Sequence, residues 1–279
     1  MEDWTRFETY RQTIAELAFK NTELVVGDVD EGELHTWPSG LKGVDDRAGG
    51  FYRCSVIGGP EKLGKSIIAL RSSLLAAEHG WRVLYYDGED GPGLNHERIC
   101  NALAADREQW PGWMDNFTAR CFGVGQTVKG IAQDAANHVG PTDEKILITL
   151  NSVNRLGKRM QRAEDVSYFQ CLQRINEWAW SLSNYTQGRI STLLVSEVNR
   201  AGRFTGQDVE YAADLLLLLE KGDESREVNM VLHSRRTAGG DLGVYIRHYH
   251  ACRFLADGER LLSDVDDDED SNPQEGLGF

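Results

Sequence analysis

The sequence of 279 residues has no long hydrophobic run. Its longest uninterrupted aliphatic run, Leu215–Leu219, suits a buried strand and is far shorter than the roughly 18 apolar residues that a membrane-spanning helix needs. The first residues, Met1–Arg6, lack the basic segment followed by an apolar one that is typical of a secretory signal. We therefore expect a cytoplasmic protein with no membrane partner.

Cysteine is scarce and scattered. The chain has five cysteines, none of them in a Cys-x-x-Cys pair: Cys54, Cys100, Cys121, Cys171 and Cys252. Such spacing is typical neither of a disulfide framework nor of a zinc site. We expect free thiols that are buried as small apolar side chains.

Basic residues are outnumbered, with 30 Lys and Arg against 44 Asp and Glu and a net charge of −14. Half of that charge lies in the last 17 residues, Ser263–Phe279, which hold seven acidic residues and no basic one. The acidity argues against an extensive nucleic-acid-binding surface, although it allows a local one. We expect residues 263–279 to form a disordered tail. Such a tail either recruits a protein partner by charge or serves solubility alone.

The rest of the chain alternates predicted strands and helices. Residues 1–33 are predicted to form an N-terminal helical arm with an acidic linker, and residues 34–262 a single core domain. Strands are predicted at Cys54–Ile57, Arg82–Asp87, Phe117–Cys121, Lys145–Leu150, Thr192–Glu197, Asp214–Glu220, Val228–His233 and Gly243–His248. Helices are predicted at Lys65–His79, Asn95–Ala105, Val128–His138 and Val166–Tyr185. This order predicts an α/β fold, with a mainly parallel twisted sheet flanked by helices and extended by antiparallel strands.

The strongest motif is a phosphate-binding loop (P-loop). A complete G-x-x-x-x-G-K-[ST] lies between a predicted strand and a predicted helix, and with the next residue it comprises Gly59, Pro60, Glu61, Lys62, Leu63, Gly64, Lys65, Ser66 and Ile67. Its glycines let backbone N–H groups surround phosphates, and the helix N-terminus adds a favourable dipole. Lys65 is expected to reach the β- and γ-phosphates, and Ser66 to ligate Mg²⁺. The motif predicts ATP and Mg²⁺ as cofactors.

Two further residues follow predicted strands. Glu89 comes just after Arg82–Asp87, at the carboxyl end of a strand, where open α/β sheets bind their ligands. It is a candidate to polarise the attacking water, and the spacing alone fits a solvated acidic turn equally well. Asn151 follows Lys145–Leu150, where a P-loop enzyme normally carries the Asp that orients Mg²⁺ through water. An amide accepts hydrogen bonds but carries no charge, so binding is expected to survive and hydrolysis to be slow.

The order of these motifs resembles the RecA-like P-loop ATPases, and within them the group of RadA/Sms, KaiC and DnaB-type replicative helicases. The resemblance runs from about Ser39 to Phe254 and includes Gly88-Glu89-Asp90 and the segments Val198–Gly206 and His233–Tyr245. It implies a RecA-like core domain, a catalytic role for Glu89, and a head-to-tail homo-oligomer in the form of a hexameric ring or a filament.

The resemblance also implies roles for two more residues. Arg235 corresponds to the arginine that completes the ATP site of a neighbouring subunit in trans. Glu197 takes the position where relatives carry the Gln or His that senses the γ-phosphate. Together with Asn151 and with His233, which replaces a Lys, Glu197 is a departure from the family pattern. These departures imply a slow ATPase, or a protein that binds ATP without turnover.

Two groups of basic residues follow the strands that end at Asn151 and Glu197. They are Arg155, Lys158, Arg159 and Arg162, and then Arg200 and Arg203. The resemblance implies that they lie on two loops lining a central channel, where they contact single-stranded DNA. Phosphate neutralisation there predicts salt-dependent, sequence-independent binding. The alternative is an exposed, solvated helix face.

Three functions are open from the sequence. The first is an ATP-binding protein that acts on single-stranded DNA in recombination, repair or replication. The second is a KaiC-like regulator or assembly factor, in which ATP sets the oligomeric state. The third is a nucleotide-binding structural subunit. The basic groups favour the first function, while the net acidity and the altered site residues favour the other two.

Overall fold

The computed structural model describes residues 34–89, 91–105, 107–123, 126–139, 145–186, 188–198, 213–235, 239–248 and 253–256. The predicted arm, the acidic tail and the two arginines Arg200 and Arg203 lie outside these residues. No helix in the described ranges is long and apolar enough to cross a membrane.

The fold is built on one large mixed sheet. Its strands are β3 (Cys54–Gly59), β4 (Arg82–Asp87), β5 (Phe117–Cys121), β6 (Ile146–Asn151), β7 (Ile190–Glu197), β8 (Leu215–Lys221), β9 (Glu227–Ser234), β10 (Gly240–His248) and β11 (Arg253–Ala256). They lie in the order β11-β10-β9-β8-β3-β7-β6-β4-β5. Strands β8, β3, β7, β6, β4 and β5 are parallel to one another, and β9, β10 and β11 extend the sheet antiparallel from β8. The predicted fold class is confirmed.

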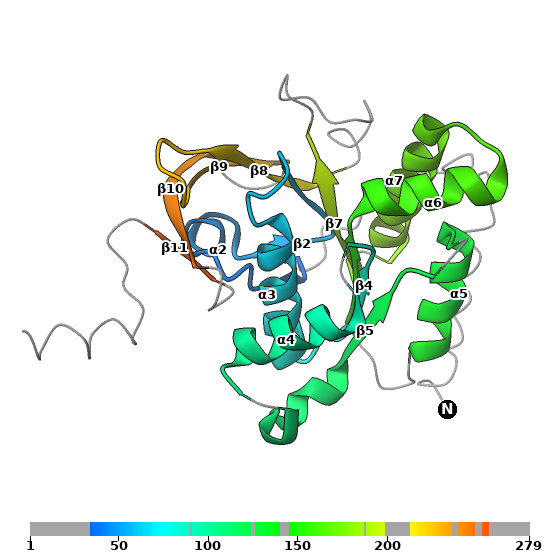
Figure 1. The fold of residues 1–279 in the computed structure, drawn as a ribbon, viewed down its shortest axis with the longest axis horizontal. Helices are drawn as coiled ribbons and strands as arrows, with labels where there is room; N and C mark the ends of the chain where they lie inside the picture. The colour runs from blue at the N-terminus through cyan, green and yellow to red at the C-terminus, as the bar shows by residue number, and fades with distance from the viewer. Residues whose placement is uncertain are drawn as a thin grey trace, which may run out of the picture.

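Helices cover both faces of the sheet (Figure 1). Helices α3 (Lys65–Glu78) and α4 (Pro92–Leu103) lie on one face, and α5 (Val128–His138), α6 (Val153–Glu164) and α7 (Tyr168–Tyr185) on the other. Successive side chains of a strand point to opposite faces. Accordingly, Ile57 of β3 joins the core beneath α3, and Val56 joins the core beneath α7. Apolar side chains on both faces explain why the central strands are almost wholly buried.

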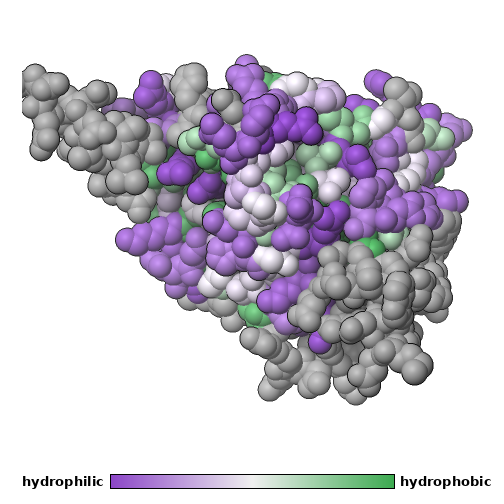
Figure 2. Space-filling view, turned by 90° about the horizontal axis from the view of Figure 1, so that it is seen from below, coloured by the Kyte–Doolittle hydropathy of each residue, from purple (hydrophilic) through white to green (hydrophobic). Residues whose placement is uncertain are grey.

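Smaller elements complete the described chain. Helix α2 (Lys42–Ala48) and a two-stranded sheet of β1 (Thr36–Trp37) and β2 (Phe51–Tyr52) precede the P-loop. Two 3₁₀ helices, Arg107–Gln109 and Gly112–Asn116, lie between α4 and β5. On the face shown in Figure 2, hydrophilic side chains predominate and hydrophobic ones lie between them in small groups.

Several elements were not predicted from the sequence: α2, α6, β11, the short strands β1 and β2, and the two 3₁₀ helices. Helix α6 corrects an expectation, because the first basic group lies on a helix and not on a loop. Val153, Leu156 and Met160 recur at helical spacing and are buried against α7 and β7. The basic residues take the remaining positions of the same helix.

Candidate nucleotide-binding site

The P-loop connects the end of β3 at Gly59 to the start of α3 at Lys65. Gly64 caps the helix with a φ of 89°, a left-handed conformation that side chains disfavour. A Cβ on Gly64 would lie 2.6 Å from Cζ of Phe254 in β11, and a Cβ on Gly59 would lie 2.7 Å from the Leu219 carbonyl oxygen. The two glycines are therefore required by close approach of other strands as well as by the turn.

A cavity of about 380 Å³ opens beside this loop. It has the size of a small-molecule site. Its walls come from the P-loop, β4, α4, α6 and β7, and are lined by Glu61, Lys62, Gly64, Lys65, Ser66, Ile67, Glu89, Arg98, Arg155 and Glu197. Gly59, Pro60 and Leu63 of the motif do not line it. The fold thus brings Glu89 and Glu197, which are far apart in the sequence, to one cavity with the P-loop.

Lys65 is buried at the floor of this site, with 6% of its surface exposed. Its Nζ donates a hydrogen bond of 2.7 Å to the Pro60 carbonyl oxygen, so the side chain folds over the loop. Burial lowers the pKa of Lys65, while the charges of Glu89, Glu197 and Glu61 raise it again. The three carboxylates thus favour the ammonium form, which is the form that pairs with phosphate.

Ser66 lies at the centre of a small polar network. Its Oγ is 3.1 Å from Glu89 Oε2 and 3.0 Å from Asn151 Oδ1, and it donates to these two acceptors. Ser66 and Asn151, which the sequence predicted around Mg²⁺, therefore lie side by side with Glu89, the predicted catalytic residue. Hydroxyl, carboxylate and amide oxygens are the hard donors that Mg²⁺ prefers.

The donor set fits a magnesium ion that is shared with a nucleotide. In the described ranges, no group of three His, Cys, Asp or Glu side chains could hold a metal ion alone. Mg²⁺ in P-loop proteins takes phosphate oxygens and water together with one or two protein ligands. Ser66 would be the direct ligand here, with Asn151 and Glu89 receiving hydrogen bonds from its water shell.

Asp87 belongs to the same network and was not singled out from the sequence. It ends β4, is 1% exposed, and lies opposite Asn151 in the register of β4 and β6. Its Oδ1 accepts hydrogen bonds from Asn151 Nδ2 at 3.2 Å and from the backbone N–H of Glu89 at 2.8 Å. The sequence offered one sign of it, an acidic residue closing a strand two residues before Glu89.

Comparison with solved structures gives the fold a name. The chain matches a DnaB-like replicative helicase (TM-score 0.63, 16% identity), the ATPase domain of G40P (0.62, 14%) and a KaiC-like protein from Pyrococcus horikoshii (0.59, 16%). The match covers 81%, 81% and 80% of this chain, and 62%, 92% and 99% of the respective relatives. This chain has the RecA-like fold. It spans less than two thirds of the helicase chain. No protein-family model and no curated protein matches the sequence.

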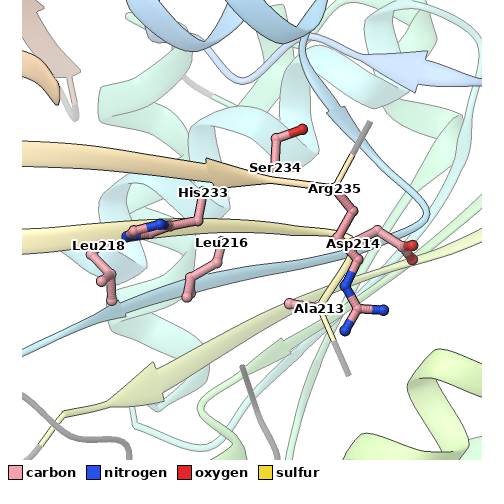
Figure 3. Close-up of a pocket in the computed structure, with 7 residues that line it drawn as sticks. All are labelled: Ala213, Asp214, Leu216, Leu218, His233, Ser234 and Arg235. Atoms are coloured by element: carbon pink, nitrogen blue, oxygen red, sulfur yellow. The ribbon is translucent and has the colours of Figure 1, made fainter. Parts of the chain in front are cut away.

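In this RecA-like fold Arg235 lies outside the P-loop cavity. It follows the last residue of β9, and its backbone N–H donates a hydrogen bond of 3.0 Å to the Asp214 carbonyl oxygen. Its side chain lines a second cavity of about 410 Å³, together with Ala213, Asp214, Leu216, Leu218, His233 and Ser234. Figure 3 shows the guanidinium extending past Asp214, away from His233 and Leu218. Arg235 therefore does not reach the phosphates of its own chain.

The first basic group divides on α6. Arg155 lines the P-loop cavity and lies against Gly88, where a Cβ would be 3.1 Å from that of Arg155. Arg159 Nη1 donates to the carbonyl oxygens of Phe122 and Gly123 at 2.7 and 2.6 Å. Lys158 and Arg162 are exposed. Arg159 thus makes hydrogen bonds within the chain, Arg155 is exposed at the P-loop cavity, and Lys158 and Arg162 are exposed elsewhere on α6.

Glu197 ends β7 beside the P-loop, opposite Gly59 in the sheet register. Its backbone N–H donates a hydrogen bond of 2.8 Å to Asn154 Oδ1 of α6. Arg200, which follows Glu197 closely in the sequence, lies outside the described residues. Arg98 and Arg155 line the same cavity as Glu197 and bring positive charge to the same site as its carboxylate.

Proposed function

We propose that the chain binds ATP with Mg²⁺ in the cavity beside the P-loop. The observation that carries this proposal is the meeting of Lys65, Ser66, Glu89 and Asn151 at the carboxyl ends of β3, β4 and β6, where RecA-like folds have their open edge. Arg98 and Arg155 line the same cavity and would add positive charge beside the triphosphate.

The same residues support a slow hydrolysis. Glu89 would accept the proton of the attacking water, and its backbone N–H bond to Asp87 fixes the turn that carries it. Lys65 would balance the charge that develops on the γ-phosphate. Asn151 keeps the hydrogen-bonding role of the usual Asp without its charge, which is the reason to expect low turnover.

The position of Arg235 supports a homo-oligomer, in the form of a ring or filament. Because its side chain lines a different cavity from the P-loop, it can reach a γ-phosphate only in another copy of the chain. A heterologous, head-to-tail interface would place the second cavity of one subunit toward the P-loop of the next.

Single-stranded DNA is the proposed ligand of the assembled protein, in recombination, repair or replication. The exposed Lys158 and Arg162 of α6, with Arg200 and Arg203, would neutralise backbone phosphates. The same helix begins two residues after Asn151, so contact with DNA there would be felt close to the magnesium ligands.

ATP turnover with and without single-stranded DNA tests this function, with the mass of the assembly measured in parallel. Faster turnover on DNA and a larger assembly with ATP are expected. The proposal would be contradicted if turnover did not change with single-stranded DNA and the mass of the assembly did not change with ATP.

A KaiC-like regulator is the second candidate. The net charge of −14 and the use of Arg159 as an internal hydrogen-bond donor favour it, because both reduce the surface available to DNA. For this function, ATP changes sedimentation while DNA at low salt leaves it unchanged.

A further inference from the structure

The buried carboxylate of Asp87 lies next to the position at which the chain has lost one. Asn151 ends β6 and Asp87 ends β4, and the two residues are partners across these parallel strands. Asn151 is fully buried and Asp87 is 1% exposed. Their hydrogen bond of 3.2 Å, from Asn151 Nδ2 to Asp87 Oδ1, is therefore shielded from water.

This bond decides which end of the amide faces the metal site. An ionised carboxylate only accepts hydrogen bonds, so it takes the NH₂ group of Asn151. The amide oxygen is then turned to the other side, where Ser66 Oγ donates to it at 3.0 Å. With the amide reversed, its NH₂ group would face a cation and its oxygen would face the Asp87 carboxylate, and both contacts would be unfavourable.

We propose that Asp87 is a positioning residue of the magnesium site. It holds Asn151 with the amide oxygen toward Ser66 and the water shell of Mg²⁺, and it supplies from the neighbouring strand the negative charge that Asn151 lacks. This inference rests on the proposed binding of ATP with Mg²⁺.

The contact between Asp87 and Asn151 also predicts the effect of restoring an Asp at position 151. Asn151→Asp alone would bring two buried carboxylates into contact, and such a pair holds one proton rather than two charges. It is not expected to strengthen the metal site. Asp87→Asn combined with Asn151→Asp moves the one negative charge to the end of β6. Because Asp87 Oδ1 accepts from both Asn151 Nδ2 and the Glu89 N–H, an Asn at 87 can keep only one of these two hydrogen bonds beside the new carboxylate.

The test is the Mg²⁺ dependence of binding of a fluorescent ATP analogue, measured by titrating MgCl₂ into wild type, the two single variants and the double variant. Asp87→Asn removes the charge and keeps the shape, and is expected to raise the Mg²⁺ concentration at half-effect about tenfold. Binding in EDTA and the melting temperature should stay near wild type. The double variant is expected to recover part of this loss, because the charge lies again at one of the two strand ends while one hydrogen bond of the pair is missing.

Asp46→Asn on the exposed surface of α2 is the matched control for loss of one negative charge. A Mg²⁺ dependence that Asp87→Asn leaves unchanged would overturn the proposal, as would a double variant no better than Asp87→Asn. A wild-type chain that binds the analogue neither with Mg²⁺ nor in EDTA would instead contradict the proposed function, so the two failures can be told apart.

Discussion

The P-loop cavity and the cavity at the end of β9 are lined by different kinds of side chain. The first collects charged side chains from the P-loop, the turn after β4, α4, α6 and β7. Lys65, Ser66 and Glu89 line it, and the buried Asn151 contacts Ser66 from behind. The second is bounded by Leu216 and Leu218 on β8, and carries Arg235 at its edge. The first has the parts of a nucleotide site, whereas the second holds Arg235, which we propose acts on the nucleotide site of another copy of the chain.

The largest expected effect is the loss of turnover when the carboxylate of Glu89 in the P-loop cavity is removed. Glu89→Gln keeps the shape of the side chain and removes the base, so turnover should fall by about 10²–10⁴-fold. Binding of the nucleotide should be retained, because Lys65 and Ser66 are unchanged. Turnover is measured by phosphate release. Full activity of this variant would show that Glu89 belongs to a solvated turn.

The shared site is tested by mixing two inactive variants. Arg235→Ala alone should lower turnover by about 10³-fold, the usual contribution of an arginine supplied in trans. Lys65→Ala removes the phosphate contact in each chain. In an equal mixture about a quarter of the sites combine an intact Lys65 with an intact Arg235 from the neighbour, so activity should return to that level. No recovery after subunit exchange would argue against an arginine acting in trans.

The surface of α6 gives a smaller effect. Replacing both Lys158 and Arg162 by Ala should weaken binding of single-stranded DNA by about tenfold near 50 mM salt, and should reduce the salt dependence of binding by about one to two ions. Lys42→Ala on α2, also exposed, is the matched control. Fluorescence anisotropy with labelled DNA at several salt concentrations measures both quantities. Equal losses for the control would show that only bulk charge matters.

The smallest effect concerns the buried lysine of the first cavity. Burial lowers the pKa of Lys65 below its usual 10.5, so the charged form costs stability in the folded chain. This cost is fully present below the folded pKa and disappears as the pH rises toward 10.5. Lys65→Met should therefore melt higher than wild type at pH 8, and the difference should shrink toward pH 10. A difference independent of pH would show that the ammonium group is not the cause.

The sequence was sufficient for features that depend on neighbours along the chain. The P-loop is a local motif. The apolar run Leu215–Leu219 likewise predicts a buried strand, β8, without knowledge of the rest of the fold. Helix α6 was missed because its basic residues hid the helical spacing of Val153, Leu156 and Met160.

Asp87 could not be found from the sequence for a different reason. Its importance comes from Asn151, which is 64 residues away and meets it only because β4 and β6 pair in that register. Arg155 was likewise predicted to contact DNA by its place in a basic cluster, whereas the first turn of α6 points it toward the P-loop cavity. Pairing between strands and the direction of a helix are set by the whole core, and no local pattern encodes them.

The most direct test of the account is calorimetric titration of ATP with Mg²⁺ into the wild-type chain and into Lys65→Ala. Saturable binding of one nucleotide per chain is expected for wild type, with a loss of at least about a hundredfold in the variant because the buried ammonium no longer meets the phosphates. Binding of equal strength by both proteins would contradict a nucleotide site at the P-loop.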